Sequence, residues 1–397
     1  MENTLASCPH RLTVRTRAFR ALGRGSIPLG DTSSANDFWL IGGRLITPRG
    51  VRRGAARIAQ GRIAEIRRSA PRGARTIDTR GAFVAPGFID LHVWGEPEVV
   101  SRDAAQGGAT GFLTALGPEP PAELLRHVAA RSQARELPGA ACLGLHLEGP
   151  FLNPARGGVL PRRAMRRSSV KELARLARAS RGRLRLVTLA PEQAGGLAAV
   201  RWCRRHRIAA SLGHSDADYA DAEQAAAAGA EAVTHIFNGM RPLHHRAPSL
   251  VDAALTDARL VAMVIADGVH VKAPALRLLF RAKGPDRVAL VTDSVRGQQD
   301  SWRLRRRGGA FYAADGTLAG SALTMMGAVR NAVRLGGAAL SDAVRMAAET
   351  PARLLGAGRE RGRLTVGQRA DLVVFDKQFQ VRFTMVGGQV VYQRDNR

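Results

Sequence analysis

The sequence predicts an α/β protein: a (β/α)8 TIM-like barrel with a small β-sandwich domain built from both chain ends. Strand-like apolar runs alternate with helix-like runs over residues 86–355, and this alternation implies parallel pairing. Eight such runs occur, which is the number of strands that closes a barrel. Short strand patterns separated by turns occupy residues 37–85 and 356–397. Because neither end segment is large enough to be stable alone, we expect the two to share one small domain.

The first 36 residues form a basic segment outside both predicted domains. The segment carries five arginines and one acid before Asp31, and it has no apolar stretch typical of a secretory signal. Its composition is similar to that of a transit peptide. A disordered extension, or a start codon assigned too far upstream, explains it equally well. We expect a disordered extension.

The two chain ends show hairpin patterns. Residues 38–46 are expected to form a strand, and residues 54–66 a hairpin that turns at Gln60 and Gly61. Near the C-terminus, residues 370–376 are expected to form a strand. A second hairpin there turns within residues 386–389, which include two consecutive glycines.

The barrel strands are predicted from short apolar runs and the helices from runs of helix-forming residues. Residues 216–229 contain strong helix formers, as do residues 170–179. A further helix is expected to start at Ser341 and end before Pro351. The expected strands are 87–93, 110–116, 141–147, 184–189, 209–213, 232–237, 260–266 and 288–292.

The composition excludes several classes of protein. The net charge of +27 suggests a polyanion-binding surface, but only four of the 60 basic residues are lysine. A bias toward arginine, with abundant alanine and glycine, is typical of a GC-rich coding sequence. The sequence has no nucleic-acid-binding motif and no apolar run long enough to span a membrane. Three cysteines without metal-ligand spacing fit a reducing compartment. We therefore expect a cytoplasmic protein that binds neither nucleic acid nor membrane.

Ionisable residues stand at the ends of several predicted strands. In residues 146–153, an apolar run ends on Glu148 directly before Gly149 and Pro150. A lone histidine beside an apolar run is more often a core residue than a ligand, and a lone aspartate after a strand is usually a helix cap. Together these residues are hard to explain by packing, because parallel strands are otherwise buried on both faces. The strand-end residues are Asp90, His92, Glu148, His214, His235 and Asp293.

These residue types suit metal-dependent hydrolysis. One carboxylate and two neutral imidazoles, here Glu148, His214 and His235, can hold a catalytic zinc ion and leave a coordination position for water. The metal lowers the pKa of that water. Asp293 is then the expected general base and acid, moving a proton from the water to a leaving group. The pattern predicts hydrolysis of an amide or a similar bond.

The motifs resemble those of the N-acetylglucosamine-6-phosphate deacetylase family, within the amidohydrolase superfamily. The likeness extends from about residue 38 to residue 393 and leaves only the basic N-terminus outside. Six motifs occur in the order and at the spacing of the family. They are residues 86–92, 146–153, 213–215, 234–240, 266–271 and 291–293, with further matches at 318–325 and 362–375.

The resemblance implies one divalent metal ion per subunit, zinc or iron, and a phosphorylated amino sugar as substrate. It implies that Asp293 is the catalytic acid and base. It also implies a homodimer, because the family's equivalent of Arg246 reaches the neighbouring subunit's site and binds phosphate, for which arginine is well suited. The implied metal ligands are Glu148, His214 and His235, and the implied substrate-binding residues are Asn238, Gly239, Arg246 and His270.

Two positions depart from the family pattern. Many superfamily members have a second histidine two residues after the equivalent of His92, whereas this chain has Trp94. A two-metal site is therefore not expected, and His92 and Trp94 are expected to line or support the site. The family's carbonyl-binding histidine is replaced by Leu160. Losing such a donor costs roughly 10²–10³ in rate where it stabilises an oxyanion.

Three functional hypotheses follow. The first is a metal-dependent deacetylase that converts N-acetylglucosamine-6-phosphate to glucosamine-6-phosphate and acetate. The second is an amidohydrolase that acts on a different N-acyl or cyclic amide substrate, because Leu160 has no donor. The third is a catalytically inactive member of the fold that binds nucleic acid. Retention of Glu148, His214, His235 and Asp293 argues against the third.

Overall fold

Eight parallel strands form a barrel whose strand order follows the chain. The computed structural model describes residues 37–133, 136–297, 299 and 302–395. Each barrel strand pairs in parallel with the next. The ring closes because β14 (Ser294–Arg296), which follows the last strand directly, pairs in parallel with the first. The barrel strands are β6 (Phe88–Gly95), β7 (Ala109–Leu116), β8 (Ala141–Glu148), β9 (Leu184–Leu189), β10 (Ala209–Leu212), β11 (Ala232–Val233), β12 (Val261–Ile265) and β13 (Val288–Val291).

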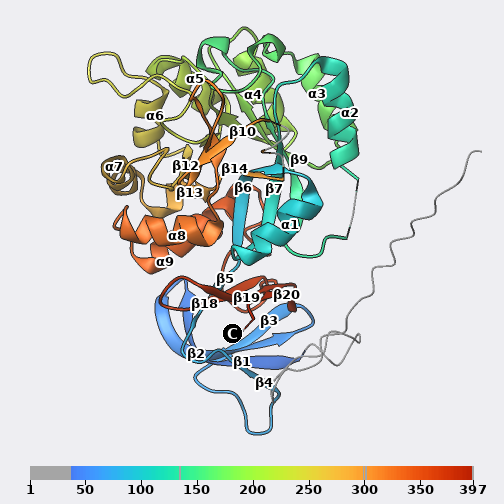
Figure 1. Ribbon diagram of the computed structural model, residues 1–397, viewed down its shortest axis with the longest axis vertical. Helices are drawn as coiled ribbons and strands as arrows, with labels where there is room; N and C mark the ends of the chain where they lie inside the picture. The colour runs from blue at the N-terminus through green and yellow to red at the C-terminus, as the bar shows by residue number, and fades with distance from the viewer. Residues whose placement is uncertain (1–36, 134–135, 298, 300–301, 396–397) are drawn as a thin grey trace, which may run out of the picture.

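Helices connect consecutive strands and cover the outside of the barrel (Figure 1). A short extension continues the barrel sheet beyond β14. Strand β17 (Leu318–Ser321) pairs in parallel with β14, and β16 (Ala310–Tyr312) and β15 (Arg305–Arg307) follow in antiparallel pairing. The fold class predicted from the sequence is confirmed. The helices are α1 (Pro97–Gln106), α2 (Pro121–Arg131), α3 (Val170–Ala179), α4 (Gly196–Arg205), α5 (Tyr219–Ala228), α6 (Leu250–Thr256), α7 (Ala273–Lys283), α8 (Met325–Arg334), α9 (Leu340–Ala347) and α10 (Glu349–Leu354).

Local sequence signals set the ends of two predicted helices. Helix α3 has the predicted bounds, and the Ser169 side chain accepts a hydrogen bond from the backbone N–H of Glu172 at its start. Helix α5 is shorter than predicted, because Asp218 caps it in a capping box with Asp221. It ends at Gly229, whose φ of 114° is a left-handed conformation that favours glycine.

Two other predicted elements differ from the structure by several residues. The strand expected at 232–237 ends at Val233, because the chain turns there and Phe237 has a φ of 78°. The helix expected from Ser341 to the residue before Pro351 was also wrong. Helix α9 starts one residue earlier and ends at Ala347, and Pro351 lies in the first turn of α10. Proline is tolerated there because first-turn N–H groups have no partner within the helix.

Strands from both chain ends form one eight-stranded sheet, in the order β20-β19-β18-β5-β1-β2-β3 with β4 beside β1. Its apolar core combines side chains such as Leu45 and Ile58 from the N-terminal strands with Leu372 and Met385 from the C-terminal ones. Both predicted hairpins are present. The strands are β1 (Phe38–Thr47), β2 (Gly50–Ala59), β3 (Arg62–Arg67), β4 (Thr76–Asp78), β5 (Phe83–Pro86), β18 (Leu372–Phe375), β19 (Val381–Val386) and β20 (Gln389–Gln393).

The small sheet lies against one end of the barrel (Figure 1). Strand β5 continues into β6 through Gly87, so this is the amino end of the first barrel strand. The Thr384 hydroxyl in β19 donates a hydrogen bond to the Ala105 carbonyl in α1. The opposite end of the barrel, where the strands finish, is therefore left for chemistry. The predicted domain boundaries stay a prediction, and the predicted disorder of residues 1–36 lies outside the described residues.

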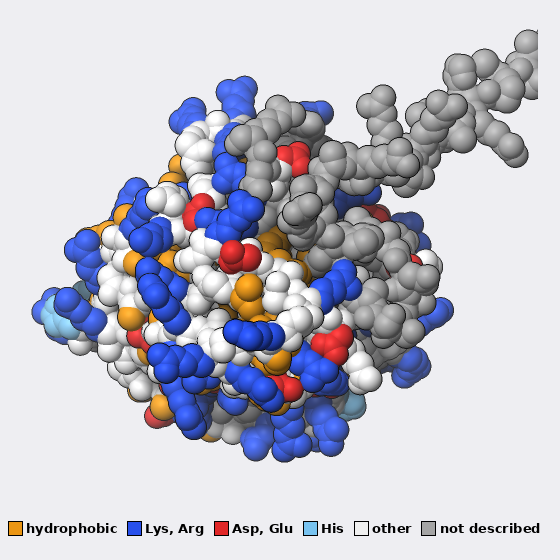
Figure 2. Space-filling view, turned by 90° about the horizontal axis from the view of Figure 1, so that it is seen from below, with side chains coloured by type: hydrophobic (Ala, Val, Ile, Leu, Met, Phe, Trp, Pro, Cys, Tyr) orange, Lys and Arg blue, Asp and Glu red, His pale blue; other side chains and the backbone are white. Residues whose placement is uncertain are grey.

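Basic side chains are dispersed over the face of the molecule seen in Figure 2, with acidic and apolar side chains between them. Within the described residues, no helix has the length and apolar character needed to cross a membrane. Cys203 is buried, and burial raises the pKa of its thiol to about 12. It is therefore a packing residue rather than a nucleophile.

Candidate active site

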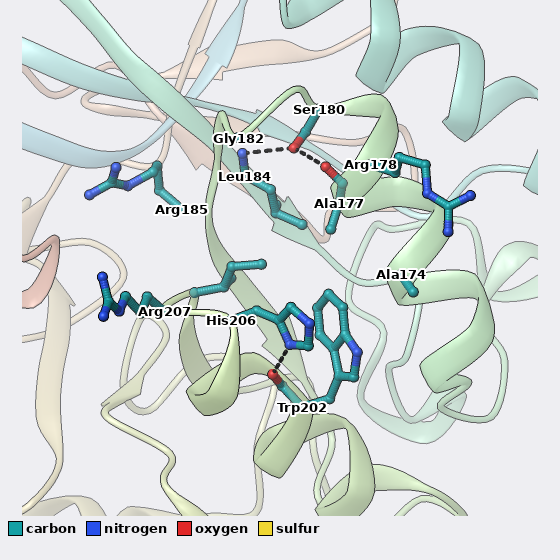
Figure 3. A pocket seen from close by; sticks show the side chains of 11 residues that line it. Ala174, Ala177, Arg178, Ser180, Gly182, Leu184, Arg185, Trp202, His206 and Arg207 are labelled. Carbon is teal, nitrogen blue, oxygen red and sulfur yellow. Dashed lines mark hydrogen bonds between the residues drawn. The ribbon is translucent and has the colours of Figure 1, made fainter.

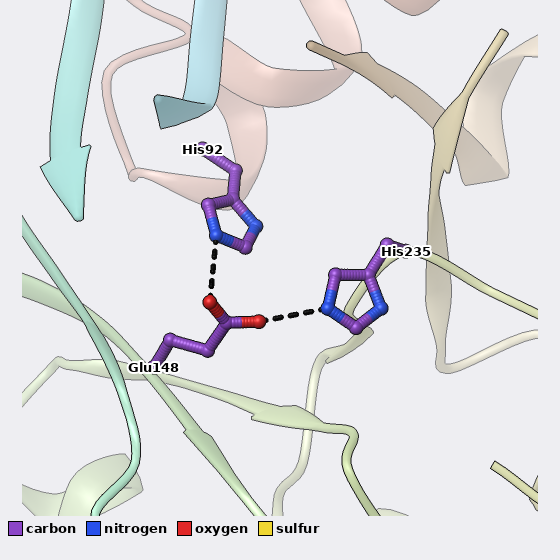
Figure 4. A group of neighbouring side chains, drawn as sticks. All are labelled: His92, Glu148 and His235. Carbon is purple, nitrogen blue, oxygen red and sulfur yellow. Dashed lines mark hydrogen bonds and ion pairs between the residues drawn. The ribbon is translucent and has the colours of Figure 1, made fainter. Parts of the chain in front are cut away.

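Glu148 is the centre of the candidate site. It is the last residue of β8, its side chain is 3% exposed, and three imidazoles surround its carboxylate. Oε1 lies 2.9 Å from His214 Nε2 and 2.7 Å from His235 Nε2. Oε2 lies 3.1 Å from His92 Nε2. Figure 4 shows His92 and His235 each pointing at a different oxygen of the carboxylate. The structure thus brings together four of the predicted strand-end residues.

The electrostatics of this cluster are dominated by burial and by the Glu148 charge. Burial alone would raise the pKa of Glu148, but His92 and the hydrogen bonds from His214 and His235 hold it well below its ordinary range. Burial opposes the charged form of His92, yet the nearby Glu148 and Asp293 carboxylates raise its pKa to about 9. The pKa of His214 is also raised despite burial, through its contact with Glu148. Without a metal, these shifts favour the ionised form of Glu148 and the protonated forms of His92 and His214.

The donor set fits a divalent metal ion. His214 Nδ1 lies 2.8 Å from the Arg156 carbonyl oxygen, which can only accept, so Nδ1 carries the proton. In the neutral ring, Nε2 then presents a lone pair toward Glu148. Two lone pairs 2.9 Å apart repel unless a proton or a cation lies between them. A carbonyl that holds the other ring nitrogen is the usual support of a metal-bound histidine.

The predicted metal ligands and the group of potential ligands that lie close together in the structure differ in one histidine. The sequence predicts Glu148, His214 and His235 as ligands, with His92 beside them. In the structure, His92, Glu148 and His235 offer ligand atoms that all lie within 4.8 Å of one another. Glu148 and His235 belong to both sets, and His214 reaches the same carboxylate oxygen as His235. The assignment of His214 as a ligand stays a prediction.

Three site residues have left-handed backbone conformations. The φ angles are 47° at His214, 30° at His235 and 46° at Asp293. Each residue lies within two positions of the end of its barrel strand. Such conformations cost a non-glycine residue roughly 1–3 kcal/mol and concentrate at functional sites. Here they turn the chain sharply where the strands finish.

The turn after β11 supports the histidines. The Asn238 amide donates hydrogen bonds of 3.2 Å to the carbonyls of His235 and Ile236, which fixes this turn. Gly239 has a φ of 63°, and a Cβ atom there would lie 2.9 Å from His214 Nδ1. Only glycine lets the backbone come this close to the ring. Their predicted contact with phosphate stays a prediction.

Asp293 lies next to the Glu148 cluster. Its Oδ1 accepts a hydrogen bond of 2.9 Å from Trp94 Nε1 and lies 3.5 Å from His92 Nε2. Trp94 belongs to an apolar cluster against which Leu160 packs. The structure therefore places Trp94 and Leu160 at the side of the site that carries Asp293.

His270 and Arg246 are placed differently. His270 follows β12, and its Nδ1 donates a hydrogen bond of 2.6 Å to Asp267. Within the described residues, no hydrogen bond engages its Nε2. Its side chain is 5% exposed. Arg246 lies in an exposed loop, where its Nη1 is 3.1 Å from His245 Nε2. Within this chain, no contact described for Arg246 brings it to the Glu148 cluster.

Sequence reasoning undervalued Asp90. This carboxylate is 4% exposed and accepts hydrogen bonds from the Thr292 hydroxyl at 2.5 Å and from the backbone N–H groups of Thr292 and His92. Burial raises its pKa to about 6. Asp90 links β6 to Thr292, the residue that follows β13 and precedes Asp293. The signal available was an acid inside an apolar run, which is rare unless the acid has partners.

His146 is a core residue. Its Nδ1 donates to the Leu91 carbonyl at 3.1 Å, and its Nε2 accepts from the Thr188 hydroxyl at 2.7 Å. Both ring nitrogens are satisfied in the neutral form, and burial together with His92 holds its pKa well below the ordinary value. It therefore packs under Glu148 as an uncharged ring.

A groove of about 520 Å³ lies elsewhere, around the start of β9 and the segment that leads into β10. Figure 3 shows Trp202 stacked against His206 there, with Arg178, Arg185 and Arg207 around the rim. The groove is at the amino ends of strands whose carboxyl ends hold the site, because Glu148 pairs with Thr188 near the end of β9. The groove is therefore separate from the candidate active site.

A strand-end carboxylate surrounded by imidazoles, with a second carboxylate beside it, is typical of a barrel hydrolase, and the cluster is a candidate metal site. The sequence matches the amidohydrolase family over residues 83–391. The chain therefore belongs to the amidohydrolase family, in the branch of the N-acetylglucosamine-6-phosphate deacetylases, as its motifs predicted.

Three relatives illustrate the similarity. The chain is 36% identical over 357 residues to N-acetylgalactosamine-6-phosphate deacetylase of Escherichia coli O157:H7, covering 84% of this chain and 93% of the relative. It is 34% identical over 398 residues to human N-acetylglucosamine-6-phosphate deacetylase, covering 90% and 92%. A mutant Mycobacterium smegmatis N-acetyl-D-glucosamine-6-phosphate deacetylase, solved with its sugar phosphate, superimposes with a TM-score of 0.82 at 32% identity, covering 90% and 100%.

Proposed function

We propose that the protein removes the acetyl group from N-acetylglucosamine-6-phosphate and releases glucosamine-6-phosphate and acetate. The main support for this proposal is that Glu148 and Asp293 lie close together at the carboxyl end of the barrel. Three imidazoles surround Glu148 there. Relatives named for this reaction align with the chain over more than nine-tenths of their own length.

The metal is proposed to be one divalent ion per subunit, zinc or iron. Glu148, His214 and His235 would hold it, with His92 beside them. When bound, such an ion is a Lewis acid that polarises oxygen. The raised pKa values of His92 and His214 favour their protonated forms without a metal. A metal-bound imidazole must be neutral, so metal binding would release protons.

Asp293 would move the proton. Among the described residues, both contacts of its carboxylate are made by Oδ1, so Oδ2 is available to water. We assign to it removal of a proton from the attacking water and delivery of that proton to the amide nitrogen, which must be protonated to leave.

The sugar phosphate would be bound by residues around the same barrel end. His270 Nε2 has no hydrogen bond to any residue that the structure describes, and Asn238 and Gly239 lie on the turn that carries His235. Arg246 would act on the partner subunit of a homodimer, which is supported by its exposed position in this chain. We place the protein in the cytoplasm because its three cysteines suit a reducing compartment.

A second candidate is hydrolysis of a different N-acyl or cyclic amide substrate. It is favoured by Leu160, which packs in an apolar cluster where the family has a carbonyl-binding histidine. A leucine cannot donate to the acyl oxygen, but it can contact a longer acyl chain.

A substrate panel tests both candidates. We expect kcat/KM for N-acetylglucosamine-6-phosphate to exceed that for the 4-epimer, the unphosphorylated sugar and the N-propionyl and N-butyryl analogues, with about one metal ion per chain in the same sample. Equal turnover of phosphorylated and free sugar would remove the phosphate assignment. Faster turnover of the longer acyl groups would favour the second candidate, and no turnover of any amino sugar would overturn the proposal.

A further inference from the structure

Trp94 has an unusual environment for a residue at the end of a barrel strand. It is the seventh residue of β6, two positions after His92, so both side chains lie on the same face of the strand. Its indole is 7% exposed and packs among Ala115, Val295 and Phe311. The ring centroid of Trp94 lies 5.2 Å from that of Trp302, in a T-shaped contact. The indole is therefore held from several sides.

The polar atom of this ring points at Asp293. Trp94 Nε1 donates a hydrogen bond of 2.9 Å to Asp293 Oδ1. An indole N–H is only a donor, so it cannot take a proton from the base. Because the rest of the ring is buried in apolar surroundings, the hydrogen bond from this N–H to Asp293 would be costly to lose.

The backbone of Asp293 is also fixed. Its N–H donates to the His92 carbonyl at 2.9 Å, and its own carbonyl accepts from the Ser321 N–H at 2.8 Å. What remains free is the rotation of the side chain. The Trp94 bond holds Oδ1, which leaves Oδ2 on the other side of the carboxylate.

Leu160 stands behind the indole. A methyl group added at Gly117 would lie 3.1 Å from Trp94 Cη2 and 3.5 Å from Leu160 Cδ2, so the two side chains meet over this glycine. Position 160 therefore contributes to the packing of Trp94 in this chain. The two positions that depart from the family pattern therefore lie in one apolar cluster.

We propose that Trp94 is a positioning residue for the hydrolytic reaction: its indole N–H holds Oδ1 of Asp293 so that Oδ2 faces the reacting water and amide. Leu160 keeps the indole in place. This inference rests on the proposed function for the role of Asp293, while the hydrogen bond itself can be tested without activity.

The kinetic test uses two replacements of Trp94. Trp94→Phe removes the N–H and part of the ring, and replacement by β-(3-benzothienyl)alanine keeps the bicyclic shape but puts sulfur in place of the N–H. We expect kcat to fall roughly 10- to 100-fold in both, as for loss of a hydrogen bond to a charged group, with KM changed less than about threefold. Trp302→Phe, which removes a neighbouring indole N–H, should stay within about twofold.

Melting temperature and metal content separate positioning from folding. If Trp94→Phe loses its fold or its metal, the test rests on the benzothienylalanine variant, because that side chain keeps the shape of the indole. Wild-type kcat in a folded isostere overturns the inference. A wild-type protein that hydrolyses none of the panel substrates overturns the proposed function instead.

A spectroscopic test is independent of turnover. In protein labelled with ¹⁵N-tryptophan, the Trp94 indole resonance is identified by its disappearance in Trp94→Phe. We expect its proton signal to move upfield in Asp293→Ala, because the N–H then loses a carboxylate acceptor. An unchanged resonance would show that the bond does not form and would overturn the inference in an active or an inactive protein.

Discussion

The two ends of the barrel carry ionisable side chains in opposite settings. At the carboxyl ends, His92 is fully buried and Glu148 is 3% exposed. At the amino ends, Arg178 and Arg207 line an open groove and are exposed. Exposed arginines keep most of their hydration and cost the fold little. Buried charges are costly unless they are paired, so a cluster of them indicates selection for chemistry. Burial of charge identifies the site better than the size of a hollow does.

The largest expected effect comes from removing the charge at the buried end. Glu148→Gln leaves three imidazoles without their common carboxylate. We expect bound metal and hydrolysis to fall to background, and the free energy of unfolding of the metal-free protein to drop by about 3–5 kcal/mol, as for a broken buried ion pair. Metal analysis, steady-state kinetics and denaturant unfolding measure the three effects.

A matched control is Glu65→Gln in β3. Glu65 also forms ion pairs, with Arg57 and Arg67, but its side chain is 31% exposed. The Glu65→Gln substitution should change the free energy of unfolding by less than about 1 kcal/mol and leave activity unchanged. Metal binding at the wild-type level in Glu148→Gln would show that the cluster is structural and would break the contrast between the two ends.

The next effect is a pH dependence of the metal-free protein. His92 has its pKa raised from 6.5 to about 9 and His214 is shifted in the same direction. Their stabilisation is therefore complete below pH 6.5 and is lost as pH rises through 9. Glu148 is shifted the opposite way, so its contribution is present above pH 4.5 and is lost as pH falls below it. The cluster therefore stabilises the metal-free protein most between pH 4.5 and pH 6.5.

We expect the free energy of unfolding of the metal-free protein to fall by up to about 3 kcal/mol between pH 6.5 and 9. The metal-bound protein should lack this decline, because its imidazoles are neutral. His92→Gln should flatten the curve of the metal-free protein. A decline of the same size in wild type and His92→Gln would place its origin outside the cluster. Urea unfolding at a series of pH values provides the measurement.

Much of the site could be predicted because it follows from strand order. Parallel strands finish at the same end of a barrel, so Glu148, His214 and His235 had to converge once each was placed at a strand end. The same reasoning placed Asp293 beside them. Helix α3 was predicted to the residue because its cap and its apolar spacing lie within a few positions of one another.

The remaining contacts depend on distances that strand order does not set. Trp94 and Asp293 are 199 positions apart, and their hydrogen bond forms only because the last strand returns to the first. The sequence marked Trp94 and Leu160 as departures without showing that they share one apolar cluster. Arg246 was assigned from resemblance, and its exposed loop shows why a single chain cannot complete that assignment.

The smallest expected effect lies at the exposed end of the barrel. Arg178→Ala and Arg207→Ala each remove an exposed charge from the rim of the groove (Figure 3), where neither side chain forms a hydrogen bond or ion pair within the described part of the chain. We expect kcat/KM within about twofold of wild type and a change in the free energy of unfolding below about 0.5 kcal/mol. Kinetics on the sugar phosphate and denaturant unfolding test both values. A larger loss of activity would mean that the groove is energetically coupled to the site at the carboxyl ends of the strands. Burial of charge would then no longer be enough to identify the functional end of this barrel.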